Sequence, residues 1–124
     1  MKGITIKEPY VSPIAQGRKH YETRSWKTNY RGEIFIHTAK STLPAPVQGL
    51  KLIFPLGCIV MKARLTDCVY MDSDFIETIK KDPMEYALGF YEIGRYAWKL
   101  EDIEIIDPIR AKGKQGFWHY YGRI

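Results

Sequence analysis

One long alternating stretch does most to limit what this chain can fold into. From Cys58 to Met71 the sequence reads CIVMKARLTDCVYM, and apolar and polar residues alternate along most of it. That period is typical of a β-strand with one buried face. From Phe75 the apolar residues recur at helical spacing instead, so the strand must end near Met71. We therefore expect an extended strand over residues 58–71 that can bend along its length.

Shorter strands are predicted on both sides of this one. Their segments are apolar or alternating, rich in β-branched and aromatic residues, and separated by Gly, Pro and Asn. The expected ranges are 3–7, 21–26, 33–38, 96–100, 102–106 and 117–119. Pro108, Gly113 and Gly116 predict a loop before the last of them.

Helices are predicted only in short pieces. The first covers 10–16 and ends at Gly17, a residue type that often follows a helix C-terminus. Two more cover 75–79 and 84–88, with a break at Pro83 and a cap in the Asp72-Ser73-Asp74 run. Residues 41–55 contain three prolines and a glycine, which predicts a loop with a helical turn or two.

Together these elements favour a mostly β chain of the α+β class. Six or so short strands with few helices predict a small, largely antiparallel barrel with two to four short helices on its outside. A ferredoxin-like α+β sandwich is the alternative. At 124 residues the chain is long enough for one domain, which we place at residues 1–124.

The rest of the composition narrows the class of protein. Hydrophobic residues make up 45% and charged residues 27%, as in ordinary globular proteins. The two cysteines have no C-x-x-C spacing, and no apolar run approaches the length of a membrane span. The histidines and cysteines lack metal-site spacing. We expect a soluble, cytoplasmic protein with no metal, no cofactor and no membrane partner.

Charge is distributed unevenly along the chain. Residues 1–31 have a net charge of +5, residues 32–72 of +1, residues 73–107 of −5 and residues 108–124 of +4. The two basic ends can converge on one positive surface, which would suit a phosphate-bearing partner.

A dense polar cluster lies at residues 17–24. If this segment is a strand, Glu22 and Arg24 are two residues apart and project from the same face, where they can form an ion pair. Lys19 can bring an ammonium to the same place. From the spacing alone, a solvated surface pair and a small ligand site both remain open.

The spacing Gly-x-Lys-x-x-Glu-x-Arg, here Gly17, Lys19, Glu22 and Arg24, resembles the signature of the ASCH domain family, whose fold is the barrel of the PUA domain. Further segments resemble the family in the same order, and we identify the chain as a small, single-domain member. They are Ile4–Tyr10, Ser25–Trp26 with Tyr30–Gly32 and Ile34–His37, Gly94–Trp98, and Lys112–Trp118.

The resemblance implies an RNA-binding module that recognises RNA or a modified nucleotide in a cleft lined by Lys19, Glu22 and Arg24. A base needs a stacking surface and hydrogen-bonding groups, and a phosphate needs Lys or Arg. We add Trp26, Arg31, Lys112 and Lys114 to the expected RNA-binding residues. Tyr96, Trp98 and Trp118 are further candidate platforms, although the alternating strand around Trp98 predicts that it lies in the core.

An enzyme is the alternative. Some small members of the family remove the acetyl group of N4-acetylcytidine with a Lys base and a Thr nucleophile three residues later, but Glu22 stands where that Thr would be. Thr23 is predicted to face the other side of the strand. Lys19 and Glu22, or Lys19 and His37, are candidate catalytic residues for hydrolysis of a nucleoside amide or for slow RNA cleavage.

Two weaker hypotheses complete the set. His37 lies in an apolar strand, which predicts a structural histidine rather than a catalytic one. An apolar patch near Val47–Phe54 would suit a protein-interaction module. The oligomeric state is not predictable from the sequence.

Overall fold

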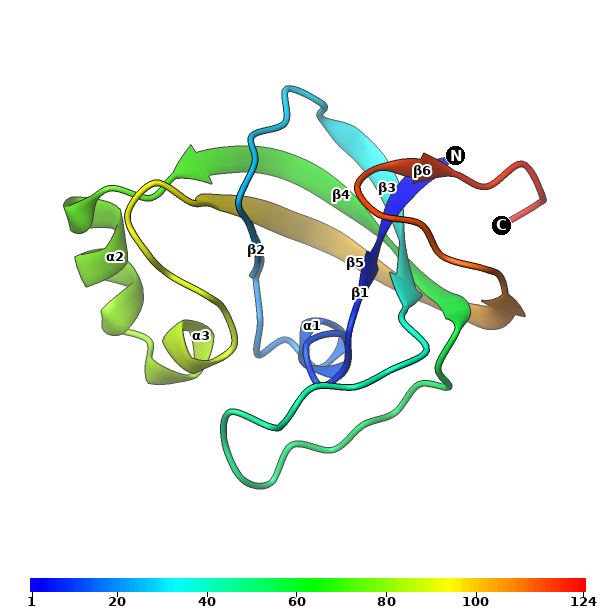
Figure 1. The fold of residues 1–124 in the computed structure, drawn as a ribbon, viewed down its shortest axis with the longest axis horizontal. Helices are drawn as coiled ribbons and strands as arrows, with labels where there is room; N and C mark the ends of the chain where they lie inside the picture. The colour runs from blue at the N-terminus through cyan, green and yellow to red at the C-terminus, as the bar shows by residue number, and fades with distance from the viewer.

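Two long antiparallel strands run through the centre of the structure, a computed structural model that describes residues 1–124. β4 (Cys58–Tyr70) confirms the long strand expected from the alternation. It pairs with β5 (Tyr96–Arg110), and three shifts of register along the pair allow both strands to bend. Figure 1 shows this pair extending across the molecule behind β2.

β5 corrects the expectation of two strands followed by a loop at Pro108. The sequence predicted that the two strands would be separated at Glu101. Instead the chain continues as one strand there, with a shift in its register against β4 and with Asp102 at φ 51°. Strand β2 (Tyr21–Arg24) pairs with β5 only as far as Lys99. Beyond Lys99 one edge of β5 has no strand neighbour, so Pro108 can stay in the strand although it has no N–H to donate.

The remaining strands complete a single six-stranded sheet of order β2-β5-β4-β3-β1-β6. Every neighbouring pair is antiparallel except β1 with β3, which is parallel. The expected α+β fold, largely antiparallel with short helices, is therefore confirmed. The other strands are β1 (Lys2–Ile6), β3 (Gly32–Thr38) and β6 (Trp118–His119).

The sheet is bent but does not close into the expected barrel. β2 and β6 are its two edge strands, and they do not pair with each other. β6 pairs only with Lys2 and Gly3, so β1 has no strand partner on that side beyond Gly3. We call the opening between β1 and β2 the seam (Figure 1).

Three short helices pack outside the sheet, within the expected number. α2 (Ser73–Lys80) and α3 (Pro83–Ala87) begin at Asp72 and Asp82, whose carboxylates accept N–H bonds of 2.8 and 3.2 Å. α1 (Ser12–Ala15) is followed by Gly17 at φ 74°, the left-handed conformation that glycine adopts most readily. Residues 41–55 form an irregular loop without the expected helical turn.

The main core lies between the strands and α1. It contains 13 buried apolar residues, among which Trp98 is fully buried. The expectation that Trp98 is a core residue is confirmed. Its indole N–H donates to the Trp26 carbonyl at 3.3 Å, so the core also fixes the chain just after β2. No helix in the structure is both long and apolar enough to cross a membrane.

Candidate functional site

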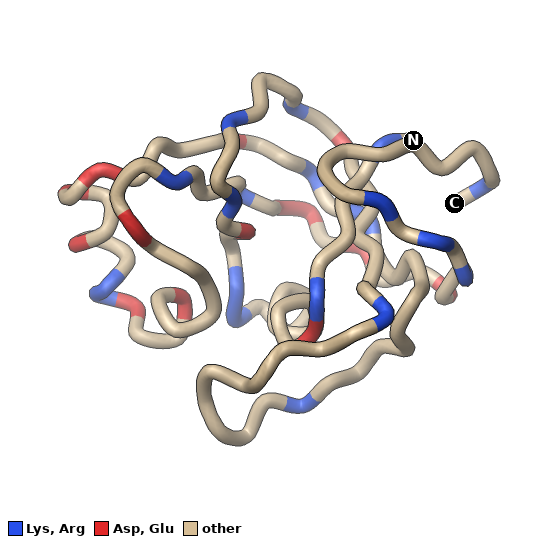
Figure 2. Tube along the Cα trace, viewed as in Figure 1, with Lys and Arg blue, Asp and Glu red and all other residues tan.

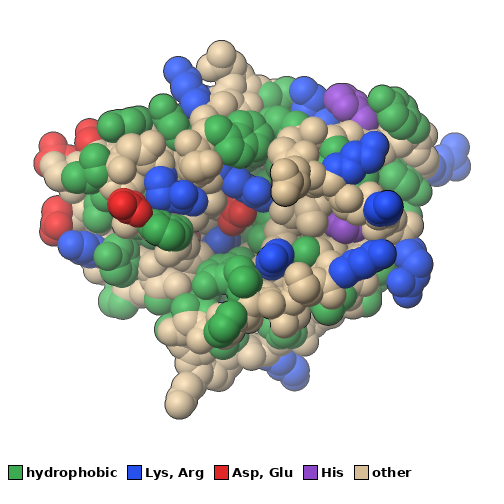
Figure 3. Space-filling view, in the orientation of Figure 1, with side chains coloured by type: hydrophobic (Ala, Val, Ile, Leu, Met, Phe, Trp, Pro, Cys, Tyr) green, Lys and Arg blue, Asp and Glu red, His purple; other side chains and the backbone are tan.

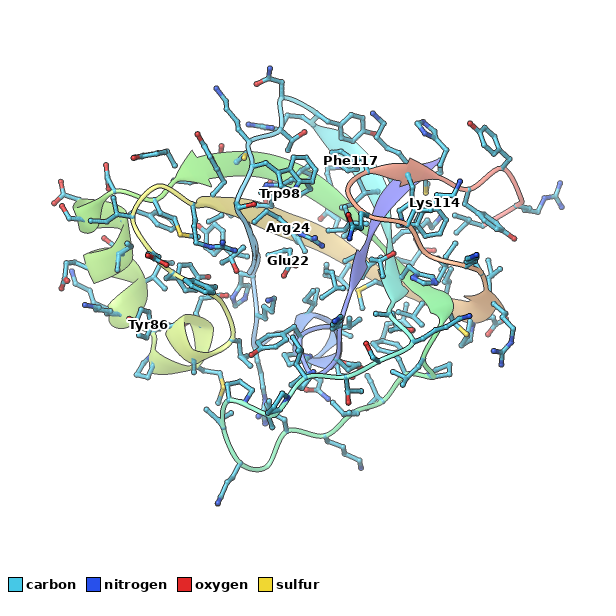
Figure 4. The ribbon with its side chains drawn as sticks, viewed as in Figure 1. Glu22, Arg24, Tyr86, Trp98, Lys114 and Phe117 are labelled. Carbon is cyan, nitrogen blue, oxygen red and sulfur yellow. The ribbon has the colours of Figure 1, made fainter.

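The seam contains a cavity of about 640 Å³, which we call the seam cavity. Its polar floor is formed by Lys19, Glu22 and Arg24, and β1 contributes Thr5 and Ile6 on the opposite side. In Figure 4 Glu22 and Arg24 project from β2 into the space toward β1. The opening that keeps the sheet from closing is therefore the place where the signature residues gather.

Lys19 and Glu22 form a buried ion pair. Their side chains are 1% and 10% exposed, and Lys19 Nζ lies 3.0 Å from Glu22 Oε1. Lys19 also donates to the carbonyl of Leu88 at 2.7 Å and lies over the ring of Tyr10. A buried cation with these partners is fixed in position, unlike a solvated surface lysine.

Arg24 bridges the seam, and some N–H groups of its guanidinium have no hydrogen-bond partner in the protein. Its Nη2 donates to the Thr5 carbonyl on β1 at 3.0 Å, and its Nε lies 3.3 Å from Glu22 Oε2. That Nε atom is buried without a well-aligned hydrogen bond. A guanidinium has five N–H donors, so most of them remain available to a ligand. Glu22 and Arg24 therefore do pair with each other, a point that the sequence left open.

An aromatic wall faces this polar floor. It consists of Tyr86 on α3 and of Phe90 and Tyr91 in the segment that follows α3. Tyr86 stacks on Tyr91 with ring centroids 6.0 Å apart, and Phe90 is 58% exposed with the Arg95 guanidinium over its ring. Exposed rings at the rim of a cavity provide surfaces on which a planar ligand can stack.

Glu85 fixes the aromatic wall to β2. This buried carboxylate accepts the His20 backbone N–H at 2.9 Å, contacts His20 Nδ1 at 2.7 Å and accepts the Tyr91 hydroxyl at 3.4 Å. Burial, together with the Glu85 charge, raises the pKa of Tyr91, so the hydroxyl stays protonated and donates. Burial also raises the pKa of Tyr21.

Beside the seam cavity lies a second hollow of about 600 Å³, which we call the basic groove. Of the residues expected to bind RNA, it brings together Arg24, Trp26, Lys112 and Lys114. Arg24 lines both hollows. Arg31 lines neither, because its guanidinium binds the carbonyls of Thr28 and Tyr30 and lies 3.8 Å from Asp67.

The aromatic candidates have different environments. Trp26 is half-buried, packs edge-on against Trp98 at 4.7 Å and lines the basic groove. Trp118 was a candidate platform but is buried against Phe35, where a ligand could not stack on it. Tyr96 packs against Tyr70 and lines neither hollow.

His37 is a structural histidine, as expected. Its Nε2 lies 2.7 Å from the Ala111 carbonyl, and its Nδ1 lies 3.1 Å from the Thr5 hydroxyl, which also accepts the Trp118 indole N–H. Burial lowers the pKa of His37. Because a carbonyl can only accept, Nε2 carries a proton, and the lowered pKa keeps the ring neutral at pH 7. Both ring nitrogens are occupied by protein groups, which weakens the case for acid–base catalysis with Lys19.

Several lining residues escaped the sequence analysis. Tyr86 was read only as part of a helical pattern, while Phe90 and Tyr91 had no pattern that pointed to the cavity. Thr23 was expected to face away, but it also lines the seam cavity, because the segment after α3 folds against it and the Phe90 N–H donates to its hydroxyl at 2.9 Å. No cluster of three or more His, Cys, Asp or Glu side chains is arranged to hold a metal ion.

The chain is similar to known proteins over most of its length. A family model described as "ASCH domain" matches residues 4–113, a range that includes the floor and wall of the seam cavity. The chain is also 28% identical to human activating signal cointegrator 1 and 27% identical to the mouse protein of the same name, each over 128 aligned positions and 79% of this chain. It spans about a fifth of the length of these relatives (22%).

Proposed function

This chain belongs to the ASCH domain family, and from that premise we propose that it is an RNA-binding module that takes one base, plain or modified, into the seam cavity. Association with RNA is the general property of the family. The choice of ligand and of the cavity is our proposal for this chain.

The observation that carries the proposal is the polar floor beneath an aromatic wall. Lys19, Glu22 and Arg24 are held by each other and by the backbone before any ligand arrives. The cavity volume, about 640 Å³, is within the usual range of about 300–1,000 Å³ for small-molecule sites. Such a site can bind one base without having to order its own side chains first.

The floor offers both kinds of hydrogen bond that a base edge needs. The Glu22 carboxylate has about four acceptor positions, so it can accept from an amine or ring N–H of a base while it pairs with two cations. Arg24 can donate to a base carbonyl through N–H groups that the protein does not use. Tyr86 and Phe90 can stack on the face of the base.

The test is fluorescence anisotropy with a labelled single-stranded RNA of about eight nucleotides. The variant Tyr86→Ala/Phe90→Ala removes the two wall rings that are exposed, at 39% and 58%, and leaves the buried Tyr91 in place. We expect it to weaken binding about five- to 150-fold, because stacking contributes about 1–3 kcal/mol per base. Tyr70→Ala is the matched control, since Tyr70 is also exposed and lines no cavity; it should change the affinity by less than about two-fold.

A folded wild type without RNA affinity, or equal losses in both variants, would overturn the proposal. The same protein incubated with N4-acetylcytidine or with short RNA tests the alternative, a hydrolase that uses Lys19 and Glu22 as acid and base. The contact of 3.0 Å between these two groups inside the cavity is the observation that favours it. Product that disappears in a folded Glu22→Gln variant would assign a hydrolase instead.

A further inference from the structure

The basic groove has a concentration of positive charge that the signature residues do not explain. Four lysines line it, and none of its 12 lining residues is acidic; the lysines are Lys7, Lys40, Lys112 and Lys114. They come from the end of β1, the end of β3 and the loop between β5 and β6. Figure 2 shows lysines and arginines on these segments, and in Figure 3 no acidic side chain is visible on the right half of this face.

These lysines are also free of acidic partners. The ion pairs of the structure use Lys19, Lys62 and Lys80, but none of the four groove lysines. All four are exposed. Five of the nine acidic residues of 73–107 lie on or near α2 and α3, at the other end of the molecule (Figure 2), and the other four lie on β5. Like charges that gather without counter-charges attract anions and raise their local concentration.

The loop that carries two of these lysines is anchored at its backbone. The Ala111 carbonyl accepts a hydrogen bond from the Nε2–H of His37. Gly113 lies so close to β1 and β3 that a Cβ there would be 2.6 Å from Thr5 Oγ1 and 2.7 Å from His37 Cε1. Only glycine fits this approach. The backbones of Lys112 and Lys114, on either side of Gly113, are thereby held at the rim of the groove.

The two hollows form a continuous path. Thr5, Lys7 and Arg24 line both, so a strand that places a base in the seam cavity has its next phosphates beside the groove lysines. Lysine ammonium groups bind phosphates as point charges and carry no sequence information.

We propose that the basic groove is a phosphate subsite that binds the phosphodiester backbone of a single strand. The inference rests on the proposed function in one respect: the strand in the groove is the one whose base enters the seam cavity. The ligand class is then an oligonucleotide rather than a free nucleoside, and groove binding follows the phosphates whatever the bases are.

The test uses a probe that has phosphates but no bases. An abasic single-stranded oligonucleotide of about six units is titrated into labelled protein, and amide chemical shifts are followed by NMR. We expect it to shift Gly113 and Gly116 in the groove. RNA of the same length should shift these and also Gly89 and Phe90 at the seam cavity. The variant Lys112→Ala/Lys114→Ala should lose the groove shifts, whereas Lys51→Ala/Lys81→Ala, which removes two exposed lysines outside both hollows, should keep them.

The outcomes separate the two proposals. An abasic strand that leaves Gly113 and Gly116 unchanged, or shifts them equally in Lys112→Ala/Lys114→Ala, would overturn the phosphate subsite. RNA that shifts only the groove amides, like the abasic strand, would support the subsite while it contradicts base binding in the seam cavity.

Discussion

The seam cavity and the basic groove share Arg24, but their charged side chains differ in burial and in pairing. On the floor of the seam cavity the charges are largely buried and paired with each other, with Lys19 3.0 Å and Arg24 3.3 Å from Glu22. In the groove the lysines are exposed and have no acidic partner. Buried pairs hold fixed geometry, whereas exposed like charges provide attraction that salt weakens. On our proposals, the seam cavity discriminates between ligands and the basic groove attracts anions.

Of the variants that test this comparison, Glu22→Gln should cause the largest loss of unfolding free energy. It leaves the buried Lys19 ammonium and the Arg24 guanidinium without their counter-charge, and breaking a buried pair costs about 3–5 kcal/mol of unfolding free energy. Urea denaturation measures the loss. As its control, Lys112→Ala/Lys114→Ala in the groove should change stability by no more than about 0.5 kcal/mol. Equal losses in the two variants would erase the distinction between the two regions.

Arg24→Lys sharpens the comparison at the junction of the two regions. Lysine keeps the charge but lacks the planar fork, so the bond from Nη2 to the Thr5 carbonyl across the seam is lost. A hydrogen bond from a charged group contributes about 1.5–3 kcal/mol, and we expect a loss of stability in that range by urea denaturation. Unchanged stability would mean that this bond does not hold the seam together.

Tyr91→Phe tests whether Glu85 holds the aromatic wall. It removes the hydroxyl that Glu85 accepts, and we expect a loss of about 0.5–1.5 kcal/mol. Because the pKa of Tyr91 is raised, this tyrosine should not ionise near pH 10 with the exposed ones. The ultraviolet titration of tyrosinate near pH 10 should therefore be the same in wild type and variant. A smaller signal in the variant would contradict the account.

The smallest expected effect is a pH dependence from His37 beneath the groove. Its pKa is lowered in the folded protein, so below about pH 6.5 the unfolded chain takes up the proton first. The neutral His37 ring therefore makes its full contribution to the free energy of unfolding above about pH 6.5. This contribution declines as the pH falls toward the lower pKa of the folded state. Urea denaturation at several pH values should show the difference between wild type and His37→Gln shrinking in this window. A constant difference would refute the assignment of a neutral ring.

Much of the fold follows from local sequence. The alternation at 58–71 predicts β4, and the Asp72-Ser73-Asp74 run and Pro83 predict where α2 and α3 begin, because capping and helix breaking depend only on neighbouring residues. The continuation of β5 through Pro108 was missed. Whether a proline fits in a strand depends on whether the strand has a partner at that point, which is a property of the whole sheet.

The residues of the site also differ in whether local sequence could predict their place. That Lys19, Glu22 and Arg24 lie close together was predictable, since they lie within six residues and two of them share a strand face. That they line a cleft was expected only from the family resemblance. The aromatic wall was not predictable, because Phe90 reaches the cavity only through contacts between distant segments, such as its N–H bond to Thr23. Lys7 and Lys40 likewise join the groove through the pairing of β1 with β3, which no local pattern shows.

The most direct test of the central claim is the affinity for single-stranded RNA measured over a range of salt concentrations. The account predicts that Phe90→Ala weakens binding equally at every salt concentration and leaves the slope of log Kd against log salt unchanged. It predicts that Lys112→Ala/Lys114→Ala lowers the magnitude of that slope by about 1.4, since each phosphate contact on a single strand contributes about 0.7. If both variants changed the slope alike, or neither changed it, the division into a base site and a phosphate site would be contradicted.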